Sequence, residues 1–445
     1  MTVVRSVLAA TALALLLIWT GCGDVYRPVA TPITPNPPNP GFTHLVLVLS
    51  GNGLNNPGAS STIDVSGDTT VSQSTLGLMP VHAALLPSIT VAYAANSLDD
   101  TVSEYFAITP SPVETIGLPS SCGAPPCSNP VFVATSENAT VYVANSGDGT
   151  ENAAVHIAKS GNGTVAVIAT ANNVVANTIP VGINPVGVAE IPNGQTLYVA
   201  NAGNGTSNGS VTSVNTIDQT VNPPIKSLNP PNTNAVWISP VWVAARSDSA
   251  RVYVLDKGAG TVSAIDTSSD TVVGVASVGV GADFMVYNPT LNRLYVANPV
   301  SGAVFMLAAS TDALATVAAP AAIANPVSVA ALPDGTRIYV SSATVSGLTV
   351  TSKVTVINTA DGSVKTTIPL TSVRQVCAST PYELFTAAAA DSSRVYVGNC
   401  DVGNTAVIQT SDDTLLLQLA APVSAQKPVN GVPPPQNPVF VLAGP

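Results

Sequence analysis

The chain has 445 residues, of which 46% are hydrophobic and only 9% charged, and its formal net charge is −11. An acidic chain has no electrostatic attraction for a phosphate backbone, so this balance argues against nucleic-acid binding. Beyond the N-terminal segment, no stretch is apolar throughout the roughly 20 residues that a helical membrane span needs. Apolar residues instead come in short runs broken by Gly, Pro, Asn, Asp and Ser, which predicts many short buried strands and almost no helix.

The N-terminal segment has the layout of an export signal. Arg5 precedes an apolar run over residues 7–18, and Trp19-Thr20-Gly21-Cys22 follows. This end resembles a bacterial lipoprotein signal, in which Cys22 becomes the lipidated first residue of the mature protein, although Trp19 stands where such signals usually carry Leu. The alternatives are ordinary secretory cleavage that leaves Cys22 as a free thiol and, less favoured, an uncleaved anchor, for which the apolar run is short.

These observations divide the chain into a lipoprotein-type signal peptide over residues 1–21, a tether over residues 22–42 and one globular body over residues 43–445. The tether is dense in proline, which lacks an amide donor and favours an extended spacer. Its prolines are Pro28, Pro32, Pro35, Pro37, Pro38 and Pro40.

The body begins with three predicted strands, Leu45 to Leu49, Ser61 to Ser66 and Thr70 to Leu76. A strand of the form aliphatic-Tyr-aliphatic then recurs along the chain. Its tyrosines account for seven of the eleven in the protein, and we expect them to pack between neighbouring sheets. They are Tyr93, Tyr142, Tyr198, Tyr253, Tyr295, Tyr339 and Tyr396.

A proline followed by a short apolar run recurs before these strands, as in Pro130-Val-Phe-Val-Ala and Pro240-Val-Trp-Val-Ala. The stretch from Arg251 to Gly281 shows what comes next, namely strands over 252–255, 261–266 and 271–278 joined by tight turns. Each unit therefore has four strands, here called a to d, over roughly 40–57 residues, and this period is typical of a β-propeller. Counting the central strands predicts eight blades, with seven as the alternative.

The first unit lacks a proline-led strand a, and the missing strand occurs at the far end as Pro438-Val-Phe-Val-Leu442. We therefore predict an all-β propeller of four-stranded antiparallel blades, closed into a ring by its C-terminal strand, which leaves no unpaired inner edge.

Three of the central strands carry a family resemblance. Leu197-Tyr-Val-Ala-Asn201, Val141-Tyr-Val-Ala-Asn145 and Leu294-Tyr-Val-Ala-Asn298 resemble the YVTN β-propeller repeat, and the likeness extends over nearly all of residues 43–443. The resemblance implies the fold and no single function. Family members include surface and periplasmic proteins of mostly undefined role, and related seven-bladed propellers include sugar-acid lactonases and quinone-dependent dehydrogenases.

Antiparallel strands place the a–b and c–d turns on one face of the disc and the b–c and d–a connections on the other. The second face is predicted to carry the insertions, so it is the candidate binding face; neutral drift of tolerant loops is the alternative. The insertions are 120–129, 146–163, 202–210, 229–239, 342–353 and 422–437.

After Cys22, four cysteines remain, and all four map to this elaborated face. An even number in an exported chain permits two disulfides that staple loops. We predict the pairs Cys122 with Cys127 and Cys377 with Cys400, although four cysteines allow three connectivities.

The sequence offers no catalytic constellation. The three histidines, His44, His82 and His156, show no metal-ligand spacing, and no nucleophile elbow or phosphate-binding loop is found. We therefore predict no catalytic, cofactor-binding or metal-binding residues and no cofactor.

The leading hypothesis is a non-enzymatic binding scaffold, exported to the bacterial cell envelope and lipid-anchored there, facing the periplasm or the cell surface. It would be a monomer that binds a protein, glycan or small molecule through its long-loop face, and the membrane through its lipid. The first alternative is a lactonase-like hydrolase at the propeller channel, which a cluster of charged or metal-binding side chains at the channel mouth would favour. The second is a purely structural surface protein, which self-assembly into arrays would favour.

Overall fold

A computed structural model describes residues 44–53, 55–87, 90–109, 113–119, 128–136, 140–146, 162–205, 208–228, 236–310, 314–374, 376–377, 384–422 and 437–444. The chain divides into two units, Met1–Phe42 and Thr43–Pro445. The predicted signal peptide, the tether and Cys22 lie outside the described residues. No helix among the described residues is long and apolar enough to cross a membrane.

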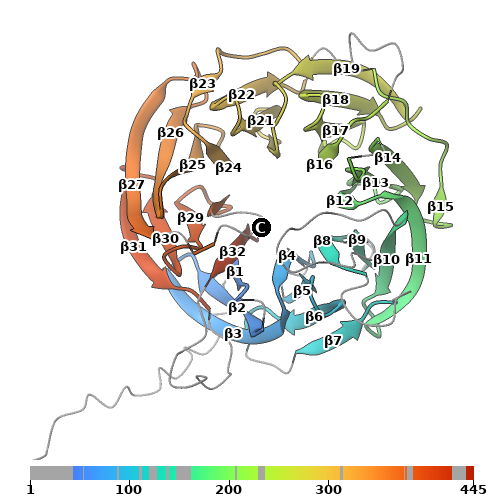
Figure 1. The fold of residues 1–445 in the computed structure, drawn as a ribbon, viewed down its shortest axis with the longest axis horizontal. Helices are drawn as coiled ribbons and strands as arrows, with labels where there is room; N and C mark the ends of the chain where they lie inside the picture. The colour runs from blue at the N-terminus through green and yellow to red at the C-terminus, as the bar shows by residue number, and fades with distance from the viewer. Residues whose placement is uncertain are drawn as a thin grey trace, which may run out of the picture. The chain divides into compact units, whose positions relative to one another are not determined.

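The second unit is an eight-bladed β-propeller, and each blade is a four-stranded antiparallel sheet (Figure 1). The predicted fold class and the count of eight blades are therefore confirmed.

Blade 1 contains β1 (Leu45–Ser50), β2 (Pro57–Asp64), β3 (Thr69–Leu78) and the C-terminal strand β32 (Pro438–Ala443). Blade 2 contains β4 (Pro80–Leu85), β5 (Val91–Asn96), β6 (Thr101–Phe106) and β7 (Glu114–Gly117). Blade 3 contains β8 (Pro130–Thr135), β9 (Thr140–Asn145), β10 (Asn162–Ala169) and β11 (Val174–Ile183). Blade 4 contains β12 (Pro185–Glu190), β13 (Thr196–Asn201), β14 (Ser210–Asn215) and β15 (Thr220–Val221).

The second half of the ring repeats this order. Blade 5 contains β16 (Pro240–Ala245), β17 (Arg251–Asp256), β18 (Thr261–Asp266) and β19 (Thr271–Ser277). Blade 6 contains β20 (Phe284–Asn288), β21 (Arg293–Asn298), β22 (Ala303–Ala308) and β23 (Ala321–Ala322). Blade 7 contains β24 (Pro326–Ala331), β25 (Arg337–Ser346), β26 (Thr349–Asn358) and β27 (Val364–Arg374). Blade 8 contains β28 (Leu384–Ala388), β29 (Arg394–Asn399), β30 (Asn404–Gln409) and β31 (Thr414–Ala420).

The ring closes where the sequence predicts. β32 runs antiparallel to β1, with Leu47 opposite Leu442 and Leu49 opposite Phe440, and so supplies the strand a that blade 1 lacks. The amide of Gly444 also donates to the carbonyl oxygen of Leu45 at 2.7 Å. The first and last strands of the propeller are therefore joined by backbone hydrogen bonds.

Strand b of each blade is buried on both faces because neighbouring blades cover it. Six of the seven repeated tyrosines also donate a hydrogen bond from the side-chain hydroxyl to the next blade. Each of the six therefore links two blades as well as filling the core, and we call each such hydrogen bond a latch. Four of the acceptors are the last residue of a c–d turn and have a positive φ of 50–57°, a conformation that Asn and Asp tolerate better than other side chains. These four pairs are Tyr93 with Asn173, Tyr198 with Asp270, Tyr339 with Asp413 and Tyr396 with Asp68.

Candidate functional site

The looped face, defined by the b–c turns and d–a connections, is described in part. Of the predicted insertions, 342–353 is described completely and 202–210 except for residues 206–207, whereas most of the other four lies outside the described residues. Cys122, Cys127 and His156 also lie outside them, so the predicted Cys122–Cys127 pair stays a prediction.

The insertion in blade 7 is a strand extension, where the sequence analysis expected a loop. β25 and β26 pair without a break as far as Ser346 opposite Thr349, and β27 follows them to Arg374. The physical reason is the composition of Thr344-Val-Ser-Gly-Leu-Thr-Val-Thr-Ser352, where β-branched residues flank a turn at Gly347 with a φ of 62°. The result is a hairpin that lengthens blade 7 on the looped face.

Large aliphatic side chains are exposed on the looped face. Val300 in a b–c turn is 77% exposed, and Leu348 at the tip of the blade 7 hairpin is 69% exposed. Seven of the fourteen exposed large hydrophobic residues of the described chain lie on this face, and the others are divided between the opposite face and the outer strands. The seven are Leu228, Ile238, Val280, Val300, Val345, Leu348 and Val376.

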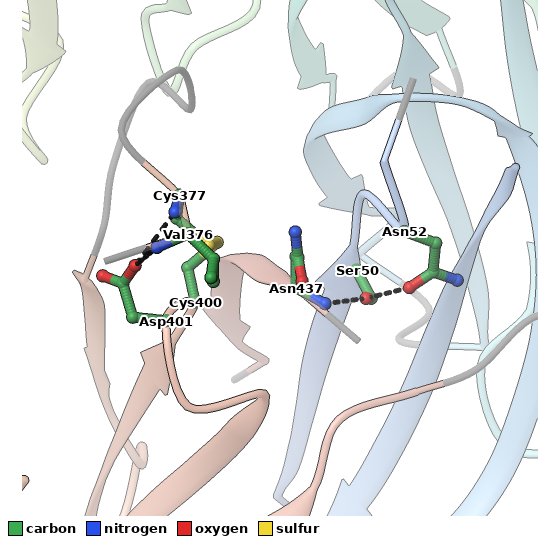
Figure 2. Close-up of a disulfide and its surroundings, with 7 residues drawn as sticks. All are labelled: Ser50, Asn52, Val376, Cys377, Cys400, Asp401 and Asn437. Carbon is green, nitrogen blue, oxygen red and sulfur yellow. Dashed lines mark hydrogen bonds between the residues drawn. A yellow bond between two sulfur atoms is a disulfide. The ribbon is translucent and has the colours of Figure 1, made fainter. Parts of the chain in front are cut away.

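A buried disulfide holds one connection of this face in place. Cys377, in the d–a connection that precedes blade 8, is bonded to Cys400, which follows strand b of that blade. This is the second pair that the sequence analysis names. Figure 2 shows the bond beside Asp401, whose Oδ1 accepts hydrogen bonds from the amides of Val376 and Cys377. The staple lies near the ring-closure contacts, where Ser50 Oγ accepts from the amide of Asn437 at 2.9 Å.

Carboxylates fix two further d–a connections in the same way, each accepting from two successive backbone amides. Such charge-assisted bonds to backbone N–H groups are stronger than neutral ones, so the described part of the looped face is a firm platform. These are Asp100 with the amides of Ser128 and Asn129, and Asp256 with the amides of Ile238 and Ser239.

A ring of aromatic side chains surrounds the propeller axis. Each comes from the innermost strand of a different blade and contacts the next, with centroid distances from 3.8 Å for His82–Phe132 to 6.3 Å for Phe132–Trp242. Blades 4 and 7 contribute the small residues Gly187 and Ser328 at this position. The six members are His82, Phe132, Trp242, Phe284, Phe385 and Phe440. Aromatic contacts therefore stabilise the centre of the ring, and sequence reasoning did not identify them.

Burial in this ring lowers the pKa of His82 from 6.5 to about 3. Its Nδ1 accepts a hydrogen bond from the amide of Val133 at 3.3 Å, so the proton of the neutral imidazole is on Nε2. Below pH 6.5 the imidazole of His82 is protonated in the unfolded chain, whereas in the native state it stays neutral until about pH 3. We therefore expect the free energy of unfolding to fall as the pH falls through this window, by at most about 1.4 kcal/mol per pH unit for this one group.

Denaturant unfolding at several pH values checks this expectation. The variant His82→Phe keeps an aromatic side chain in the ring and should show a shallower loss of stability between pH 6.5 and pH 4. Both proteins retain His44 and His156, so only the difference between their slopes reports on His82. Equal slopes would show that the buried imidazole does not contribute.

One ion pair links blade 5 to blade 6. Lys257 Nζ lies 3.3 Å from Asp283 Oδ2, where Asp283 occupies the position that carries Val in most innermost strands. Burial raises the pKa of Asp283, and Lys257 opposes that shift. Among the described residues, no three His, Cys, Asp or Glu side chains are grouped so as to hold a metal ion.

Comparison with known proteins adds information on the fold alone. No protein-family model and no curated protein sequence matches the chain. Apo AztD from Citrobacter koseri has 10% identity and a TM-score of 0.57, with 90% of this chain and 98% of that chain covered. Candidate 6-phosphogluconolactonases from Bacteroides fragilis and Bacteroides uniformis each have 13% identity and cover 90% of this chain. Their TM-scores are 0.52 and 0.50, over 98% and 99% of their own lengths. The likeness is one of fold.

Proposed function

We propose that this protein is a non-enzymatic binding scaffold of the bacterial cell envelope, anchored by a lipid on Cys22, that holds a partner on its looped face. The exposed aliphatic side chains of that face are the observation that supports the proposal most directly. Exposed apolar surface on a firm platform is typical of a protein-binding site. A protein partner therefore fits the described surface better than a glycan or a small molecule does.

The directions of the first and last strands also support the looped face as the binding face. β1 is a strand b and begins on the short-turn face, defined by the a–b and c–d turns, and β32 is a strand a and ends there. Both ends of the described propeller are therefore on the short-turn face, and the looped face is free of them.

Membership of the YVTN repeat family is part of the proposal. It is supported by the repeated Tyr-Val-Ala-Asn strands, in which the Asn side chain is buried at the end of strand b in blades 3, 4 and 6. The solved structures named for 6-phosphogluconolactonases share the fold and nothing finer, so they neither favour nor exclude the hydrolase alternative.

A pull-down from envelope extracts with matched variants tests the proposal. We expect the double variant Val300→Asp and Leu348→Asp to lose most of the partners that the unchanged protein recovers, because each change replaces an exposed aliphatic side chain of the looped face with a charge. The control is Ile217→Asp, which alters an 81% exposed aliphatic residue in a c–d turn of the short-turn face. Equal recovery by all three proteins would contradict the proposal.

A further inference from the structure

One row of side chains crosses blade 2 and faces blade 3. The register places Tyr93 on β5 opposite Glu104 on β6, and Glu104 opposite Glu114 on β7. Asn173, in the c–d turn of blade 3, completes the row. Its Oδ1 accepts from the hydroxyl of Tyr93 at 2.7 Å and its Nδ2 donates to Glu114 Oε2 at 2.8 Å. Four oxygen-bearing side chains therefore meet at the interface of these two blades.

Glu104 is unusual for its position. In the other six blades that have the repeated tyrosine, the residue opposite it on strand c is apolar or a serine. Those residues are Val167, Ser213, Ala264, Met306, Val356 and Val407. A carboxylate is thus found where the repeat otherwise places a small or apolar side chain.

Glu104 is also mostly covered and has no partner among the described residues. It is only 8% exposed, and no described residue forms a hydrogen bond or an ion pair with it. Its cross-strand neighbour is a second carboxylate, and like charges directly opposite each other destabilise a sheet. Burial, and then the charge of Glu114, raise the pKa of Glu104.

A largely covered carboxylate beside a second carboxylate is stabilised by a counter-charge, because an uncompensated charge removed from water is costly. Neither carboxylate is paired with a lysine or arginine in the described chain. Oxygen ligands without nitrogen or sulfur suit a hard cation, and calcium accepts six to eight of them in irregular geometry. Glu114 is exposed at the outer strand, so an ion can reach the pair from solvent.

We propose that Glu104 and Glu114 bind a calcium ion at the interface of blades 2 and 3, with Asn173 Oδ1, the Tyr93 hydroxyl and water completing its oxygen ligands. The ion neutralises the two carboxylates and links β6 and β7 to the turn of the next blade. With two charged ligands, its dissociation constant should fall in the range of about 10⁻⁴–10⁻³ M that extracellular modules show. This site is independent of the looped face and of any partner bound there.

Calorimetric titration with CaCl₂ and terbium luminescence together test the proposal. We expect one saturable calcium site in the protein and tyrosine-sensitised terbium emission that calcium displaces. Glu104→Gln should weaken calcium binding at least tenfold, because it removes the buried charge with little change of shape. Tyr93→Phe should reduce the sensitised emission much more than it weakens calcium binding. Asp361→Asn, which changes an exposed carboxylate in blade 7, should leave both signals unchanged.

The thermal midpoint of Glu104→Gln in calcium-free buffer separates loss of a ligand from loss of the fold. It should equal or exceed that of the unchanged protein, because the substitution removes a repulsive charge. Absence of saturable binding up to 10 mM calcium, a figure about tenfold above the upper end of that range, would overturn the proposal. So would calcium binding that Glu104→Gln leaves intact. Stabilisation by mild acid without any effect of calcium would also overturn it, because the two carboxylates would then share a proton.

Discussion

Removal of Pro438–Pro445 is expected to prevent the propeller from closing and to leave little folded protein. The deletion removes β32, whose Val439, Phe440 and Val441 are almost completely buried. Burial of such side chains contributes about 1.5–3 kcal/mol each, so the loss is comparable with the whole net stability of about 5–15 kcal/mol that is usual for a folded domain. It also exposes the backbone edge of β1 and removes Phe440 from the aromatic ring.

Soluble yield, thermal midpoint and amide hydrogen exchange of β1 measure this effect. A synthetic peptide with the sequence of residues 438–445 should restore part of the folded protein when it is added in trans. A peptide with the same residues in shuffled order is the matched control and should restore nothing. A truncated protein with an unchanged midpoint would show that the last strand does not seal the ring.

Replacement of Asp68 by alanine is expected to destabilise the junction between blades 8 and 1 strongly. Asp68 is 7% exposed in the c–d turn of blade 1, and it accepts from Arg394 Nε and from the hydroxyl of Tyr396, both at 2.9 Å. Burial, and then the charge of Asp68, raise the pKa of Tyr396, so this hydroxyl remains a protonated donor. The substitution leaves a partly buried cation and a buried hydroxyl without their acceptor, and such losses cost about 3–5 kcal/mol.

Urea unfolding of the two variants Asp68→Ala and Asp361→Ala provides the comparison. Asp361 is also an aspartate in a c–d turn, but its carboxylate is exposed and bonds Ser363 within its own turn, so its loss should cost less than about 1 kcal/mol. Asp68→Asn retains the preference for positive φ and should be intermediate. Equal midpoints for the two alanine variants would show that the latch between blades 8 and 1 contributes nothing beyond a local turn.

The repeat could be predicted because its signals are local. Alternation in strands such as Val252-Tyr-Val254, glycine in the turns and proline at the start of strand a each reflect the backbone of a few residues. The closing strand could be predicted for the same reason, since Pro438-Val-Phe-Val-Leu442 has the pattern of most of the other strands a. The blade 7 extension was missed because its Ser, Gly and Thr residues resemble a loop in composition, whereas its β-branched Thr and Val residues also suit a strand and form a continuous ladder.

The contacts between blades were harder to predict from the sequence. The aromatic ring has a visible signal, since His82, Phe132 and Trp242 each occupy the third position of a Pro-Val-X motif, but the motif does not show that these side chains meet. The partners of the tyrosines could not be predicted either, because Asp68 and Tyr396 are 328 positions apart. The sequence analysis did not single out Glu104 or Glu114.

The amino-acid sequence by itself determined the strands, the four-stranded unit, the number of copies and the strand that completes the first of them. All of these follow from patterns that repeat within one unit. Only the tertiary structure decided which side chains of different units face one another, including the latches, the aromatic ring and the contact of Asn173 with Tyr93 and Glu114. The physical reason is that these contacts join residues far apart in the chain, 80 positions for Tyr93 and Asn173 and 328 for Tyr396 and Asp68, and no short stretch of chain carries that information.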